Sequence, residues 1–388
     1  MPSSTPARAL LAVAAATTGL LLVSGCGTAD PQPSTTTPAA SATPAGSQWV
    51  WVATEGDDAL SVIDAETGEL VSVVHGLPAP HNVQSTADGD GVWATSTSGV
   101  VQVEAATLGL VGTAGSGDHP AHVVGGPDGS VWVTSAGDGS LWQHDPGLDQ
   151  RVRHDLGGAP HGMRVSADGS FAAVANTAAG TVDLVDLTAG DATLPVRSVK
   201  VGPSPIQVAI DASGERVYVA VAGRSQVVAV DVAGGTVVER LTVPSAPAQV
   251  WVTDDGQLLS ANQGTETDPG STLSVIDTAT FTETARIDVG AGPHGVVADP
   301  DGERAWVTNM YDDSVSIVDL TTGSVLQTVP VGDAPNGITL TPEAGTVPPQ
   351  VHLDVPASSA GHDHGEGDHA DDDHGDYHDD QESEDHSH

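Results

Sequence analysis

The chain has 388 residues, enough for one large repeat domain flanked by tails. Its formal net charge is −41 with only 11 lysines and arginines, which excludes nucleic acid as a natural partner because a phosphate backbone requires a basic surface. Such an acidic surface suits cations, and it also serves solubility or a salt-rich habitat.

Residues 1–26 have the features of a secretory signal peptide. Arg8 supplies the positive charge, and residues 9–23 form an apolar stretch too short to span a membrane comfortably. The stretch ends in Leu22-Val-Ser-Gly-Cys26, which resembles a bacterial lipobox, with cleavage before Cys26 and lipid on its sulfur. Cys26 is the only cysteine, so a disulfide within the chain and a cysteine metal site are excluded. An ordinary signal peptide with an incidental cysteine is the alternative.

Residues 27–47 consist mainly of proline, threonine, serine and alanine, with almost no large apolar side chain. Such a segment cannot bury enough surface to fold, and we expect it to tether the domain to its lipid. No second apolar run of membrane length follows. We therefore expect a protein held by its lipid anchor on the extracytoplasmic face of a bacterial cell membrane.

Residues 48–345 contain seven copies of one short pattern. A turn that ends in glycine recurs in steps of 40 to 46 residues, at Gly89, Gly129, Gly169, Gly214, Gly256, Gly302 and Gly345. Short β-rich segments with alternating polarity surround each turn, and four strands with this period are typical of a β-propeller blade. The chain begins and ends within a repeat, so we expect residues 49–75 to complete the blade that residues 337–341 begin. This predicts an all-β, seven-bladed propeller of four-stranded antiparallel blades.

The repeats resemble a known family. Trp132-Val-Thr, Trp306-Val-Thr-Asn309 and the segment from Val289 to Val296 are similar to the YVTN repeat of YncE-like seven-bladed propellers. The resemblance covers about residues 48–345 and implies the fold; this family includes many binding proteins without an assigned reaction. The tryptophans at matching places in the second strands, Trp51, Trp93, Trp132 and Trp306, are expected to pack between blades.

The loop before each innermost strand, here called the inner loop, carries a proline followed within two residues by a polar side chain. Four inner loops carry histidine, and the other three carry an amide, giving His81, His122, His161, Gln207, Gln249, His294 and Asn336. In a propeller these loops converge at the mouth of the central channel, where imidazoles can bind Zn²⁺ or Cu²⁺. His81, His161 and His294 share one offset from the proline and are the stronger candidates, because His122 is shifted by one residue. Alternatively, each histidine only fills a polar loop and pairs with carbonyls or water.

Residues 346–388 are predicted to form a disordered tail, and from residue 361 it is rich in histidine and carboxylates. Residues 361–388 contain twelve carboxylates and seven histidines: His362, His364, His369, His374, His378, His386 and His388. Imidazole and carboxylate at close spacing make a multivalent site for borderline metals, with Zn²⁺ first and Ni²⁺ or Cu²⁺ next. An acidic solubilising tail is the alternative.

Tail and inner loops together predict a membrane-anchored protein that binds divalent metal and serves its acquisition, buffering or chaperoning. This architecture is similar to the zinc metallochaperones of the AztD type, His-rich propellers that serve a zinc importer, and implies a metal importer's binding protein as a candidate partner. We expect a monomer. Two alternatives remain: a non-catalytic scaffold that binds protein or glycan, and a lyase- or lactonase-like propeller enzyme that uses the histidines. No glutamate lies in the inner loops to pair with them, which disfavours the enzyme.

Overall fold

The computed structural model describes residues 48–148, 151–189 and 193–356. All of them belong to the compact unit that begins at Ala45. The predicted signal peptide and linker, and the histidine-rich tail from residue 361, lie outside the described residues. Within the described part, no helix is long and apolar enough to cross a membrane.

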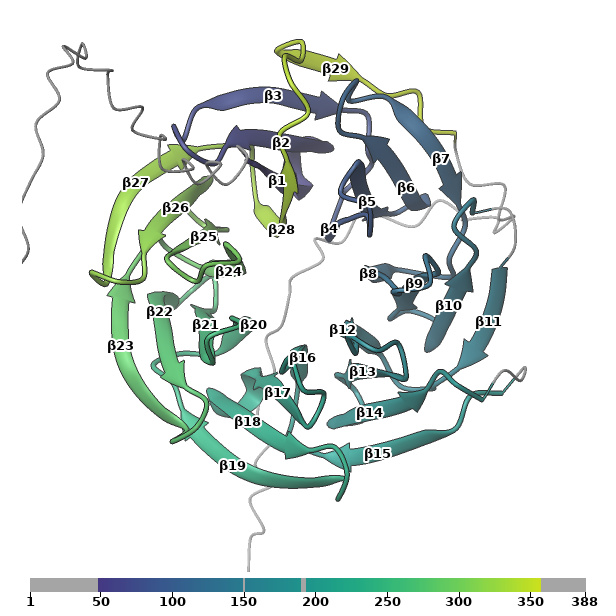
Figure 1. Ribbon diagram of the computed structural model, residues 1–388, viewed down its shortest axis with the longest axis vertical. Helices are drawn as coiled ribbons and strands as arrows, with labels where there is room; N and C mark the ends of the chain where they lie inside the picture. The colour runs from purple at the N-terminus through teal and green to yellow at the C-terminus, as the bar shows by residue number, and fades with distance from the viewer. Residues whose placement is uncertain (1–47, 149–150, 190–192, 357–388) are drawn as a thin grey trace, which may run out of the picture. The chain divides into compact units, whose positions relative to one another are not determined.

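Seven sheets are arranged in a ring, each with its first strand nearest the centre (Figure 1). We number the blades in the chain order of these innermost strands, and each blade is antiparallel from its inner to its outer strand. Blades 1 to 3 consist of β4 (Val83–Ser85), β5 (Gly91–Ser96), β6 (Gly99–Glu104), β7 (Leu110–Ala114); β8 (Pro120–Gly125), β9 (Val131–Ser135), β10 (Ser140–His144), β11 (Arg151–Asp155); and β12 (Pro160–Val165), β13 (Phe171–Asn176), β14 (Thr181–Asp186), β15 (Val196–Lys200).

Blades 4 to 6 follow the same pattern. They consist of β16 (Pro205–Ile210), β17 (Arg216–Val221), β18 (Gln226–Asp231), β19 (Thr236–Thr242); β20 (Pro247–Val252), β21 (Gln257–Gly264), β22 (Pro269–Asp277), β23 (Thr282–Asp288); and β24 (Pro293–Ala298), β25 (Arg304–Asn309), β26 (Ser314–Asp319), β27 (Ser324–Pro330). The two short 3₁₀ helices of the described part are η1 (Glu55–Asp57) and η2 (Ala222–Arg224), each between the second and third strands of its blade.

Blade 7 closes the ring with strands from both ends of the propeller. Its strands are β28 (Pro335–Pro342), β1 (Gln48–Thr54), β2 (Ala59–Asp64) and β3 (Leu70–His75), and β28 pairs antiparallel with β1. Trp51 Nε1 donates to Thr341 Oγ1 over 2.9 Å within this closure. The seven-bladed fold and its closure by residues 49–75 confirm the prediction from the sequence.

The fold extends beyond residue 345, where the sequence prediction ends the propeller. Strand β29 (Gln350–His352) pairs in parallel with the outer strand β3, so blade 7 has five strands. Leu353, only 4% exposed, anchors this segment in the apolar cluster between blades 7 and 1. The predicted end of the propeller at residue 345 is therefore wrong. The pairing of β29 with β3 satisfies an outer sheet edge that would otherwise face solvent.

Apolar clusters between neighbouring blades form the core. The cluster between blades 3 and 4, for example, combines Val182, Val208 and Val219 with neighbours from both sheets. Trp51, Trp93, Trp132 and Trp306 are at most 4% exposed and lie in such clusters, as predicted.

The glycine of each recurrent turn has a positive φ, between 67° and 96° in the seven copies. Adjacent strands of a blade are antiparallel, so these turns and the inner loops lie on opposite sides of the ring. The loops between second and third strands, including η1 and η2, share the side of the inner loops. We call this side the histidine face.

Candidate metal centre

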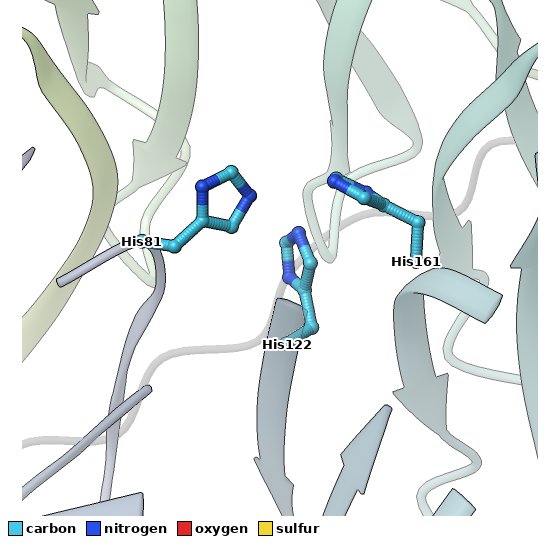
Figure 2. A group of neighbouring side chains, drawn as sticks. All are labelled: His81, His122 and His161. Atoms are coloured by element: carbon cyan, nitrogen blue, oxygen red, sulfur yellow. The ribbon is translucent and has the colours of Figure 1, made fainter. Parts of the chain in front are cut away.

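Three of the four predicted inner-loop histidines come together (Figure 2). One ring nitrogen each of His81, His122 and His161 lies within 4.8 Å of the others. His81 precedes β4, His122 lies in β8 and His161 lies in β12, so three consecutive blades supply one side chain each. We call these residues the histidine trio.

The position of His122 corrects the ranking made from the sequence. An offset of one residue in a regular strand would turn a side chain to the opposite face. Here the register shifts between Pro120 and Val123 in blade 2, and between Pro160 and Met163 in blade 3. Both histidines therefore lie within a β-bulge, where two residues oppose one and the local side-chain direction changes. For this reason His122 joins His161 despite its different spacing.

A close approach of neighbouring inner loops fixes the trio. A Cβ at Gly162, directly after His161, would lie 2.5 Å from the Ile206 carbonyl oxygen of the next blade. A second contact joins blades 2 and 3, since Thr134 Oγ1 on β9 donates to the His161 carbonyl over 2.5 Å. The glycine after the histidine and the threonine of the repeat thus serve packing of one blade against the next.

His81 has a carboxylate partner that the sequence did not reveal. Its Nδ1 lies 3.3 Å from Glu55 Oε2, and Asn336 Nδ2 donates to the same oxygen over 2.8 Å. Asn336 Nδ2 lies 3.0 Å from the same His81 Nδ1, so this nitrogen either accepts from the amide or carries a proton and donates to the carboxylate. Donation to Glu55 leaves the lone pair of the ring on Nε2, and this is the arrangement that can ligate a metal. This Nε2 is buried and has no hydrogen-bond partner among the described residues. A histidine oriented by a carboxylate through its other nitrogen is the usual arrangement of a metal ligand.

Glu55 comes from η1 of blade 7, not from an inner loop. It reaches His81 because second-to-third-strand loops share the histidine face with the inner loops. The inner loops contain no glutamate, as the sequence shows, but a glutamate from outside them pairs with His81. Counting strands along each blade would have placed Glu55 on the correct face.

His161 and His122 have different proton arrangements. His161 Nδ1 lies 3.1 Å from the Ile206 carbonyl oxygen and must donate to it, which places the ring's lone pair on Nε2. Gln207 Oε1 accepts from the Val208 amide over 2.8 Å, so Gln207 Nε2 is the donor to His122 Nδ1, 3.2 Å away. His122 Nδ1 accepts this bond. To offer Nε2 to a metal, His122 must shift its proton, and to offer Nδ1 it must release Gln207.

Burial keeps His122 neutral. Only 3% of its surface is exposed, and loss of solvation lowers the pKa of His122 well below its usual value near 6.5. The charges of His161, His81, Arg164 and His294 lower this pKa further. Because metals bind the neutral imidazole, His122 remains in the binding form under acidic conditions that protonate a free histidine.

The other predicted inner-loop residues surround the trio. The ring centroid of His294 lies 6.3 Å from that of His81, so His294 adjoins the trio without belonging to it. Asn336 contacts Glu55 and Gln207 contacts His122, as described above. Gln249 serves the backbone, since its Oε1 accepts from the Val296 amide over 2.7 Å.

Arg164, which the sequence analysis did not single out, lies three residues after His161 on β12. At about 3.3 Å per residue it is roughly 10 Å further along the strand. Its guanidinium lies over the ring of Trp251, 5.7 Å from the ring centroid, so the pair links blade 3 to blade 5. Burial lowers the pKa of Arg164 to about 10, which leaves it charged at neutral pH.

The trio fits a transition metal better than a hard cation. Neutral imidazoles suit zinc, copper and nickel, whereas calcium and magnesium require oxygen ligands. A tetrahedral zinc at about 2.0–2.1 Å from each nitrogen places these nitrogens about 3.3 Å apart, so the most widely separated pair of the trio must approach by up to roughly 1.5 Å. Cys26 and the seven tail histidines lie outside the described residues.

Comparisons with known proteins agree with this fold. The family model of YncE-like β-propellers matches residues 78–269, which confirms the resemblance inferred from the repeats. No curated protein matches the chain in sequence.

Several solved structures are similar. A chain of hydrazine synthase from Kuenenia stuttgartiensis is 22% identical, with a TM-score of 0.62 over 72% of this chain and 93% of that chain. AztD from Citrobacter koseri is 13% identical, with a TM-score of 0.58 over 76% of this chain and 98% of that chain. A putative 6-phosphogluconolactonase from Bacteroides uniformis is 14% identical, with a TM-score of 0.62 over 76% and 100%. At these identities the similarity shows the fold alone.

Proposed function

We propose that this protein binds a divalent transition metal, zinc foremost, at the histidine trio and serves metal acquisition, buffering or chaperoning. The observation that carries the proposal is the convergence of His81, His122 and His161 from three blades within 4.8 Å. The neutral state of His122 and the carboxylate behind His81 support it, because both favour metal ligation. Similarity to the AztD fold is consistent with it.

The parts outside the described residues complete the proposal. Cys26 carries the lipid that holds the protein on the extracytoplasmic face of the membrane, where the net charge of −41 attracts cations. The tail histidines collect metal loosely, and the trio holds one ion. A metal importer's binding protein is the proposed recipient.

Calorimetric titration with zinc tests this proposal on two proteins, residues 27–388 and residues 27–360. All seven blades are complete between residues 48 and 356, so both proteins keep the fold. We expect one tight site in the shorter protein, lost on His161→Ala, and several weaker sites that require the tail. If the shorter protein, which lacks the tail, binds no zinc, a metal site in the propeller is rejected.

One observation favours a second candidate, a propeller enzyme of the lyase or lactonase kind. Glu55 and His81 form an acid–base pair 3.3 Å apart, with His122 and His161 beside it. Hydrolysis of simple lactones by the purified protein, abolished in Glu55→Gln, would support the enzyme, whereas inactivity with tight zinc binding would support the metal carrier.

A further inference from the structure

A basic cavity of about 700 Å³ lies between blades 3 and 4 on the histidine face. Lys200 at the end of β15, Arg224 in η2 and Arg240 in β19 line it, together with backbone and small side chains of both blades. No aspartate or glutamate is among the lining residues.

This concentration of positive charge is unusual in a chain with 52 acidic residues and only 11 basic ones. Arg153, Arg216 and Arg286 each pair with a carboxylate. The three cavity cations make no ion pair with any described residue. Lys200 Nζ donates to the Ala179 carbonyl over 2.6 Å, and Arg240 Nη1 donates to the Val201 carbonyl over 2.6 Å. Their charges are therefore positioned but not neutralised.

We propose that the acidic tail of the same chain, residues 361–388, docks in this cavity. Its twelve carboxylates complement the three cations, and individually weak exposed ion pairs add up when several act together. The 32 residues after Pro356 span about 100 Å when fully extended. A domain of this size has a diameter of roughly 50 Å, so the tail is long enough to reach the cavity. Attachment to the same chain raises the effective concentration of the tail to the order of millimolar.

Docking places the tail beside the histidine trio. Ala159 and Ser204 form part of the cavity lining, and each lies two residues from a member of the His161–Ile206 hydrogen bond. Tail histidines would then lie close enough to transfer a metal ion to the trio. This consequence rests on the proposed function, whereas the docking itself requires no metal.

Zero-length crosslinking tests the docking, because Lys200 is the only lysine in the chain. A carbodiimide joins the Lys200 amine to a carboxylate in direct contact, and mass spectrometry identifies the linked peptide. With residues 27–388 in EDTA at low salt, we expect Lys200 linked to residues 361–388 within one chain, at a yield independent of protein concentration. Because the contact is electrostatic, 0.5 M salt should lower the yield about tenfold.

Matched variants decide the outcome. Arg224→Glu with Arg240→Glu should lower the yield at least tenfold, whereas Arg197→Glu with Arg286→Glu changes the net charge equally and should leave the yield within twofold. Unchanged yield in the cavity variant, links only to propeller carboxylates, or links between chains that increase with concentration would each overturn the proposal. Zinc titration of the same proteins separates the two proposals, since an unchanged crosslink yield in the cavity variant together with tight zinc binding rejects the docking alone.

Discussion

Replacing Glu55 with glutamine tests whether His81 is oriented as a metal ligand. The change keeps the shape and the contact with Asn336, but it removes the negative charge 3.3 Å from His81 Nδ1. Loss of such a supporting carboxylate lowers metal affinity by about 10- to 100-fold in metalloproteins. The contact is long for a charge-assisted hydrogen bond, and the Glu55 side chain is 26% exposed. We therefore expect the smaller loss of zinc affinity in this range, about tenfold or 1.4 kcal/mol.

Competition titration with a chromophoric zinc chelator measures this difference on the protein without residues 361–388. Asp57→Asn is the matched control, because Asp57 lies in the same 3₁₀ helix and accepts from the Asp333 amide instead of facing the trio. The control should change affinity by less than about twofold through screened charge alone. Equal effects of the two variants would refute the role of Glu55 behind His81.

Three further predictions follow from the structure. Burial, followed by the charge of Arg151, lowers the pKa of His144 to about 4, whereas an unfolded histidine titrates near 6.5. The free energy of unfolding therefore decreases by up to about 3 kcal/mol as pH falls from 6.5 towards 4. Urea unfolding at a series of pH values should show this slope, and His144→Phe should remove it. Gly162→Ala should destabilise the fold by about 1–3 kcal/mol and weaken zinc binding, since its Cβ meets a backbone oxygen at 2.5 Å, whereas Gly125→Ala, with nothing within 4 Å, should cost less than about 0.5 kcal/mol. Gln207→Glu supplies an acceptor for His122 Nδ1–H and so favours a lone pair on Nε2; zinc affinity should increase about tenfold, and a decrease in the same competition assay would contradict the assigned proton positions.

The sequence was sufficient for the fold because its information is local and repeated. Each glycine turn, such as Asp168-Gly169, requires a positive φ, and seven evenly spaced copies specify the blades. Strand β29 was missed for the opposite reason. It is three residues long, prolines precede it, and its partner β3 lies far away in sequence.

The candidate site was predictable in membership but not in geometry. The repeat identified the inner-loop histidines, yet only the bulges at Pro120 and Pro160 explain why His122 faces the trio. Glu55 and Arg164 carry no local motif. Glu55 reaches His81 because two loops of different blades share one face, and Arg164 of blade 3 contacts Trp251 of blade 5.

X-ray absorption at the zinc edge tests the central claim most directly. The sample is the protein of residues 27–360 loaded with one equivalent of zinc, so the tail cannot contribute ligands. We predict a first shell with three imidazole nitrogens at about 2.0–2.1 Å, reduced to two in His161→Ala. A shell of oxygen ligands alone, or zinc that is removed by simple gel filtration, would contradict a metal centre at the histidine trio.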